Sequence, residues 1–181
     1  MGDPRKQHKR YSRPTHPWRA ERINEENELV RKYGLKNKKE IWRAKSTIGR
    51  FRQQARSLLA SSGDIVEKEK KELLDRLNRM GILESRSLDD VLALTGENLL
   101  ERRLQTMVVK KGLARTMKQS RQIVVHGHVS IGDNAVAVPM YPVLKEEEDL
   151  IRVSENITEK IKVINVGEGR DKAKEAPQEA G

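Results

Sequence analysis

The stretch NLLERRLQTMVVKKGLARTMKQSRQIVVHGHVSI, residues 98–131, decides the fold of this chain, because its hydrophobic spacing changes along it. Up to residue 126, apolar residues recur every three or four positions, as on one face of an amphipathic helix. From residue 129, apolar and polar residues alternate, as in a half-buried strand. The pattern therefore predicts two helices followed by a small sheet.

Capping signals predict the bounds of the two helices. Asn98 and Glu101 have the spacing of a capping box, and Gly112 is expected to end the first helix. Thr116 with Gln119 opens a second helix, which runs to the glycine at 127. The link between them is so short that we expect a compact helical hairpin. The expected inward-facing side chains are Leu100, Leu104, Met107, Val108, Ile123 and Val124.

Three short strands are expected after the hairpin, at residues 129–131, 135–138 and 150–153. Residues 132–134 form a turn, and prolines at 139 and 142 interrupt the ladder. An α+β module of this kind has about 55 residues and is marginal alone, so it should lean on the helices that precede it. Residues 154–166 could add one further strand or a packed extension.

The preceding part of the chain reads as mostly helical. Asn24 is expected to cap a short helix that Gly34 ends. Longer helices are predicted at residues 38–61 and 65–80, and a short one at 87–94. The helix at 38–61 carries its basic residues mostly off its apolar stripe, so it can pack with one face and touch phosphates with another. That stripe comprises Ile41, Ile48, Phe51, Ala55, Leu58 and Leu59.

The two ends of the chain differ in composition from its middle. Residues 1–22 hold three prolines and seven Lys or Arg residues, and predict an extended basic arm that orders on phosphates. Residues 166–181 are rich in Gly, Glu, Lys and Ala and are expected to be disordered. Between them lie a helical domain at 23–98 and the α+β module at 99–165.

Positive charge is concentrated in two blocks. The 181 residues carry a formal net charge of +10, with +11 in residues 1–60 and +6 in residues 99–128. Clustered cations gain free energy by releasing the counterions condensed on nucleic acid, so the blocks predict a nucleic-acid partner. A solvated basic surface is the alternative. Aromatic residues are only 3% of the chain, which favours recognition of the backbone and shape of folded RNA over base stacking.

Several kinds of chemistry are excluded. The chain has no cysteine, so it has no disulfide, thiol nucleophile or cysteine zinc site. No phosphate-binding glycine loop or pocketed acid–base pair is evident, so we expect no catalytic residue and no cofactor. His126 and His128 lack an evident third metal ligand, so we expect either exposed imidazoles at a helix end beside basic residues or contact with phosphate or base. No apolar run could span a membrane, so we expect a soluble, cytoplasmic protein with no membrane partner.

The predicted RNA-binding residues lie on the hairpin, the arm and the long helix. On the hairpin, Thr116 marks a helix N-terminus whose free N–H groups favour a phosphate. The hairpin residues are Arg102, Arg103, Lys110, Lys111, Arg115, Thr116, Lys118, Gln119, Arg121, His126 and His128. The arm residues are Arg5, Lys6, Lys9, Arg10, Arg13 and Arg19. The residues on the long helix are Arg43, Lys45, Arg50, Arg52 and Arg56.

Two sets of motifs carry a resemblance to known proteins. Residues 103–104, 112–116, 120–124, 126–129 and 139–143 resemble the S-four RNA-binding domain, which also occurs in pseudouridine synthases, tyrosyl-tRNA synthetases and heat-shock RNA-binding proteins. Three further segments distinguish the chain from those proteins: DPRK at 3–6, PTHPW at 14–18 and YGLKNKKEIWR at 33–43. Together the motifs, from about residue 2 to 165, resemble the small-subunit ribosomal protein S-four family of the archaeal and eukaryotic type.

The resemblance implies a structural component of the small ribosomal subunit. Such a protein binds the five-way junction in the five-prime domain of the small-subunit rRNA, nucleates assembly of the subunit body and contributes to translational accuracy. It implies small-subunit protein S-five as a neighbour and a place near the mRNA entry path. The cysteine zinc site of some bacterial relatives is absent here. The matched positions of the RNA-facing hairpin are Arg103, Arg115, Thr116, Lys118, Gln119, Arg121, His126 and His128.

Two other classes of function remain open from the residues alone. An RNA-modifying enzyme could use the same module for docking, although the residues before it lack a pocket-forming sheet. A DNA-binding helix-turn-helix protein would also have two short helices with a tight turn. Few residues of the second hairpin helix suit the readout of base edges, which counts against that alternative.

Overall fold

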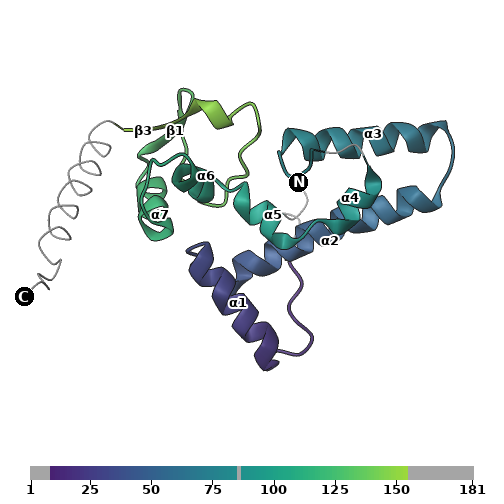
Figure 1. Ribbon diagram of the computed structural model, residues 1–181, viewed down its shortest axis with the longest axis horizontal. Coiled ribbons are helices and arrows are strands. Elements are labelled where there is room, and N and C mark those ends of the chain that lie inside the picture. The colour runs from purple at the N-terminus through teal and green to yellow at the C-terminus, as the bar shows by residue number, and fades with distance from the viewer. Residues whose placement is uncertain (1–8, 85–86, 155–181) are drawn as a thin grey trace, which may run out of the picture.

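A computed structural model describes residues 9–84 and 87–154. The longest helix within them, α2, contacts α1, α3, α4 and α5 (Figure 1). In chain order the elements are α1 (Ala20–Lys32), α2 (Lys38–Ala60), α3 (Asp64–Arg79), α4 (Leu88–Ala93), α5 (Gly96–Glu101), α6 (Leu104–Lys110), α7 (Met117–Val125), β1 (Val129–Ile131), β2 (Asn134–Ala135), the 3-10 helix η1 (Glu148–Leu150) and β3 (Ile151–Val153).

The apolar stripe of α2 serves two hydrophobic clusters. Ile41, near the start of α2, packs with α1 and α5, whereas Ile48 and Leu58 pack with α3 and α4. Figure 1 shows α3 running alongside the C-terminal part of α2, whereas α1 lies near the N-terminal end of α2. Leu59 was expected on the stripe but is 47% exposed, because it lies one residue, about 100°, around the helix from Leu58.

A third cluster builds the α+β module. Leu104 and Val108 of α6, Val124 of α7 and Val129 of β1 are all fully buried in it. The sheet is antiparallel with the order β2-β1-β3, and Ser130 pairs with Ala135 on one side and with Arg152 on the other. The prediction of an α+β chain with a helical hairpin and a short antiparallel sheet is therefore confirmed.

The prediction of one helix from Asn98 to Gly112 is wrong. The chain forms α5 and α6 instead, and the capping box is made by Thr95 and Asn98, one turn earlier than expected. Arg103 between them is extended (φ −76°, ψ 147°) and forms a β-bridge with Pro142. The carbonyl of Arg102 accepts from the N–H of Val143 at 2.9 Å. These non-local hydrogen bonds satisfy the backbone where the helix is interrupted.

Other bounds differ from prediction by a few residues. Helix α1 begins at Ala20 and not after Asn24, so the last three residues of the predicted arm are helical, helped by the ion pair between Arg22 and Glu26. Strand β2 ends at Ala135 and not at residue 138. After one more hydrogen bond, from the N–H of Val136 to the carbonyl of Val129, the chain leaves β1 and pairs with the break between α5 and α6. Residue 150 belongs to η1 and not to β3.

Some predictions lie outside the described residues. These are the segment 155–166, the tail at 166–181, and Arg5 and Lys6 of the arm. Within the described ranges, no helix has both the length and the hydrophobicity that crossing a lipid bilayer requires.

Gly34 is the point where the end of α1 meets the module. Its φ is +56°, in the left-handed region, and a Cβ there would lie 2.8 Å from the Cβ of Met117 in α7. It would also lie 3.0 Å from the amide nitrogen of Gln105. The close approach therefore requires a residue with no side chain.

We expect Gly34→Ala to lower the free energy of unfolding by about 2 kcal/mol or more, from left-handed strain and the clash with α7. The matched control is Gly49→Ala in α2, where a Cβ meets nothing within 4 Å and φ is not positive. This control should raise the free energy of unfolding by about 0.5–1 kcal/mol. Urea unfolding followed by circular dichroism measures both, and equal effects of the two variants would contradict the packing described for Gly34.

Candidate nucleic-acid interface

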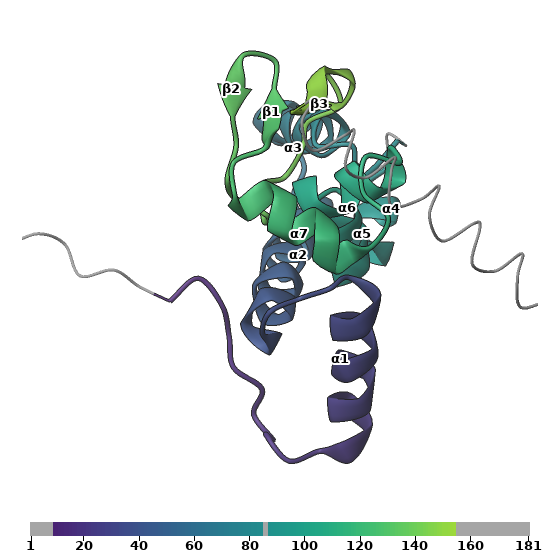
Figure 2. The ribbon, with the colours of Figure 1, turned by 90° about the vertical axis from the view of Figure 1, so that its left-hand side faces the viewer.

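The described part of the arm lies against α2. The N–H of Ser12 donates to Oγ of Ser46 at 3.0 Å, and the rings of Tyr11 and Trp42 lie 6.1 Å apart. Figure 2 shows the arm descending beside α2 before the chain turns back into α1. The arm is thus positioned by contacts with the protein itself, before any partner binds.

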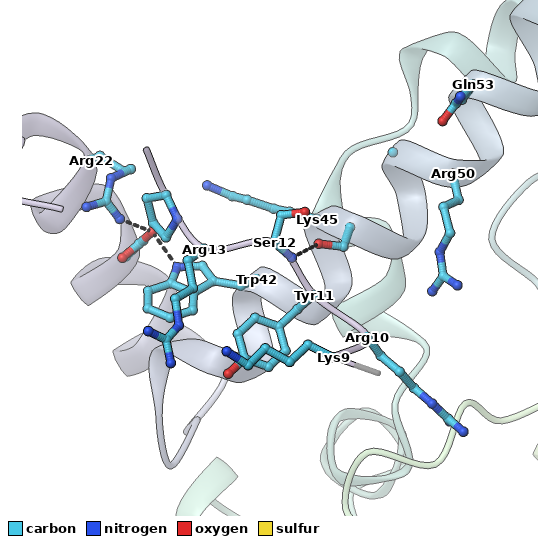
Figure 3. A pocket seen from close by; sticks show the side chains of 14 residues that line it. Lys9, Arg10, Tyr11, Ser12, Arg13, Arg22, Trp42, Lys45, Arg50 and Gln53 are labelled. Atoms are coloured by element: carbon cyan, nitrogen blue, oxygen red, sulfur yellow. Dashed lines mark hydrogen bonds and ion pairs between the residues drawn. The ribbon is translucent and has the colours of Figure 1, made fainter. Parts of the chain in front are cut away.

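Between the arm and α2 lies a groove of about 680 Å³, which we call the arm groove (Figure 3). Six cationic side chains line it: Lys9, Arg10, Arg13, Arg22, Lys45 and Arg50. Arg22 is neutralised by Glu26, at 2.6 Å. The other five are exposed and form no ion pair within the described part of the chain. Their positive potential is therefore available to an external anion.

Glu26 ties the groove to the core. It is 1% exposed and accepts hydrogen bonds from Arg22 and, at 3.0 Å, from the indole nitrogen of Trp42. Burial by itself would raise the pKa of Glu26, but the hydrogen bonds from Trp42 and Arg22 outweigh it and lower this pKa. The carboxylate therefore stays ionised. It links α1 to Trp42 of α2, the residue against which Tyr11 of the arm lies.

A second groove, of about 1160 Å³, runs between the arm and the module. Lys9 and Arg10 of the arm and Arg43 of α2 line one part of it. Met140 and Pro142, from the loop after β2, line another. The arm and the module thus border a common surface, although they are about 130 residues apart in sequence.

Glu40 and Arg103 line part of this second groove, and with Gln105 and Arg121 they make an ionic cluster that we call the Glu40 junction. Glu40 of α2 accepts from Arg103 at 2.6 Å and from Arg121 of α7 at 2.9 Å. Arg121 also donates to the side-chain oxygen of Gln105, at 3.3 Å. Glu40, Arg103 and Gln105 are each 5% exposed or less.

Gln105 extends the junction to α1. The two N–H groups of its amide are shared among the carbonyls of Tyr33 (3.2 Å), Gly34 (3.3 Å) and Met117 (2.8 Å). Its backbone carbonyl accepts from Oγ of Ser120 at 2.7 Å. Because an unpaired buried polar group costs about 1–3 kcal/mol, this set of bonds restricts the helices to one relative orientation.

Most hairpin cations are paired within the protein. Arg102 pairs with Glu148 at 2.8 Å. Lys110 pairs with Glu101 at 3.1 Å, and Lys111 with Asp149 at 3.3 Å and with the carbonyl of residue 148. These contacts reduce the net positive charge that the hairpin can offer to a partner.

The structure places the predicted RNA-binding residues in different environments. Lys9, Arg10, Arg13, Lys45 and Arg50 come together in the arm groove, with Arg43 in the second groove. Exposed residues elsewhere are Arg56 on α2 and Lys110, Arg115, Thr116, Lys118 and His126 on the hairpin. Arg19 is exposed at the start of α1 and pairs with Glu21, and Arg52 donates to the carbonyl of Leu94. Gln119, Arg121 and His128 are half-buried.

Arg103 is the clearest departure from the predicted interface. It is only 4% exposed and its guanidinium pairs with Glu40, so little of its charge is available to a phosphate in the second groove. Arg121 also belongs to the Glu40 junction, so its substitution would remove an ion pair with Glu40 as well as a cation of the hairpin. Thr116 caps α7 as predicted, and its hydroxyl accepts from the N–H of Gln119 at 3.2 Å.

The sequence analysis missed Glu40, Gln105 and Ser120. Gln105 and Ser120 are polar residues on the buried faces of amphipathic helices, which could have indicated a buried network. Glu40 gave no such signal, because its partners lie 63 and 81 residues away. Among the residues that the structure describes, no group of three or more His, Asp or Glu side chains could hold a metal ion. The rings of His126 and His128 lie 6.3 Å apart.

We expect Glu40→Gln to lower the free energy of unfolding by about 3 kcal/mol or more, because it leaves a buried guanidinium without its countercharge. Glu28→Gln, at an exposed position on α1, is the matched control and should change it by less than about 0.5 kcal/mol. Urea unfolding at neutral pH compares the two variants. Equal stability of Glu40→Gln and the unchanged chain would contradict the claim that the Glu40 junction stabilises the fold.

The junction also predicts the pH dependence of stability. Burial acts to raise the pKa of Glu40, but hydrogen bonds from Arg121 and Arg103 outweigh it and lower the pKa below the ordinary value of 4.5. The unfolded chain therefore binds this proton more tightly, so the stabilisation is present above about pH 4.5 and is lost as pH falls through the folded pKa. Unfolding measured across pH 2–7 (roughly the range over which carboxyl groups titrate) should show a smaller acid-dependent loss for Glu40→Gln than for the unchanged chain.

Comparison with known proteins identifies the family. Residues 102–149 match the family model described as S4 domain, which covers α6, α7, β1 and β2. The chain is 53% identical over 152 residues to "Small ribosomal subunit protein uS4" of Hyperthermus butylicus, a match that covers 83% of this chain and 86% of the relative. It is similarly 53% identical to the protein of that name from Methanothermobacter thermautotrophicus, covering 83% and 89%.

A third relative of the same name, from Sulfolobus acidocaldarius, is 54% identical over 153 residues, covering 83% of this chain and 87% of the relative. Identity at this level over most of both chains extends far beyond the S4 domain. The chain therefore belongs to the uS4 family of small ribosomal subunit proteins, of the archaeal type.

Proposed function

We propose that this chain is a structural, non-enzymatic component of the small ribosomal subunit and that it binds the subunit's rRNA directly. The observation that carries this proposal is the arm groove, where five exposed cations without ion pairs in the described chain gather from two segments. Phosphates of folded RNA are the ligands that such a surface favours. Membership of the uS4 family supports the ribosome as the setting and the cytoplasm as the location.

The arm groove is the main electrostatic contact in this proposal, and the hairpin is a second, weaker one. On the hairpin, Lys118 and His126 are exposed, whereas Arg102, Arg103 and Lys111 are engaged in internal contacts. The N-terminus of α7 adds N–H groups that can face a phosphate. The hairpin would therefore contribute shape and a few contacts, while the arm and α2 supply most of the counterion release.

The resemblance to the S-four family supports finer assignments. In this proposal the rRNA target is the five-prime domain, where binding nucleates assembly of the subunit body. Protein S-five would be a neighbour, the mRNA entry path would lie close by, and the protein would contribute to translational accuracy. The arm at 1–22, the helical domain at 23–98 and the module at 99–165 would act as one binding unit, with the residues after 165 outside it.

Binding to small-subunit rRNA should depend steeply on salt. For about ten neutralised phosphates, the plot of log K against log salt concentration has a slope of about −7 to −9. We expect the double substitution Arg10→Gln and Arg13→Gln to make that slope less steep by about 1.4–1.8, since two phosphate contacts are lost. Filter binding across a salt series measures the slope.

The matched control is Lys68→Gln with Lys71→Gln, which removes the same charge from exposed positions of α3, away from the arm groove. Its slope should equal that of the unchanged chain. A slope near zero for the unchanged chain would contradict the proposal, as would equal slopes for the two double variants. Co-sedimentation with small subunits after a high-salt wash tests the ribosomal setting independently.

A further inference from the structure

Trp18 is displayed on the surface in a way that packing does not explain. It is 90% exposed, although tryptophan has the largest apolar surface to bury. The chain's other tryptophan, Trp42, is half-buried and hydrogen-bonded to Glu26. Trp18 lies in the turn that joins the arm to α1, at the end of α1 that points away from the module (Figure 2).

The turn that carries Trp18 is held in place. The guanidinium of Arg22 donates to the carbonyl of Pro17 at 2.7 Å and to that of His16 at 3.2 Å. The same guanidinium pairs with buried Glu26, so the turn is tied to the core. Pro14 and Pro17 further restrict the backbone on the N-terminal side of the indole. The indole is therefore presented by a supported loop.

The surroundings of Trp18 favour a polyanion with aromatic faces. Arg13 of the arm groove is five residues away, a distance of at most about 18 Å along the chain. Arg19 is balanced by Glu21, so the net positive charge comes from the arm-groove cations. Ile65, another strongly exposed apolar side chain (74%), lies instead on α3 among charges of both signs.

We propose that Trp18 is a base-stacking site for an unpaired RNA nucleotide whose neighbouring phosphates occupy the arm groove. This inference deepens the proposed function and rests on it. Every base has an apolar π-face that stacks on an indole, whereas paired bases inside a helix are unavailable. The indole would thus direct the arm to a place where the folded RNA leaves a nucleotide out of its helices, while the cations hold the backbone.

The first test measures binding of the full chain to a transcript of the five-prime domain of archaeal small-subunit rRNA. We expect Trp18→Leu to weaken binding about ten-fold, as loss of one stacked base does. Trp18→Phe should bind within about three-fold of the unchanged chain, because its ring still stacks. The salt slope should be the same for all three, since the indole carries no charge. Ile65→Ala is the control for loss of an exposed apolar side chain and should leave affinity unchanged.

The second test uses the fluorescence of Trp18, obtained as the emission of the unchanged chain minus that of Trp18→Phe. Oligoadenylate should quench this emission, and a fully paired RNA duplex of the same length should not, because only the single strand offers free base faces. The difference emission also identifies whether Trp18 contacts naked rRNA or becomes shielded only in assembled subunits.

These outcomes separate the inference from the proposed function. A steep salt slope with equal binding by Trp18→Leu would overturn the stacking site and leave rRNA binding intact. Shielding of Trp18 only in the assembled subunit would assign the indole to a protein neighbour and would also overturn it. Failure of the unchanged chain to bind the transcript would instead reject the proposed function.

Discussion

One buried carboxylate holds the two halves of this molecule together. Glu40 of α2 accepts from Arg103, between α5 and α6, and from Arg121 of α7, and Gln105 links the same cluster to the end of α1. Burying these charges is costly unless each is paired. An alternative packing of the helical part on the module would leave at least one charge without its partner, which is how the cluster selects a single arrangement.

This arrangement explains why the arm groove and the module share a surface. Helix α2 carries Glu40 on its buried side and Lys45 and Arg50 on its exposed side, so fixing the helix against the module also fixes the direction of its cations. The arm then lies on α2 through Tyr11 and Ser12. The positive surface is therefore organised before RNA binds, which lowers the entropy that binding must overcome.

Local elements were largely predictable from the residues. The spacing of Ile41, Ile48 and Leu58 indicated α2, and Thr116 indicated the start of α7, because helix periodicity and capping depend on neighbours in sequence. The interruption between α5 and α6 was not predictable, since Arg102 and Arg103 bond to the backbone of residues 142–143. Local propensity contains no information about such a partner, and the hydrophobic pattern continues through the break.

The sequence by itself determined the fold class, the bounds of most helices, the position of the basic blocks and the resemblance to the S-four family. Only the tertiary structure decided which cations can meet a partner. Arg103 and Lys9 are both cations in the basic blocks of the sequence, yet Arg103 is enclosed beside Glu40 and Lys9 is exposed in the arm groove. The physical reason is that a charge is neutralised by whatever carboxylate folding brings within a few ångströms, and here that carboxylate lies 63 residues away.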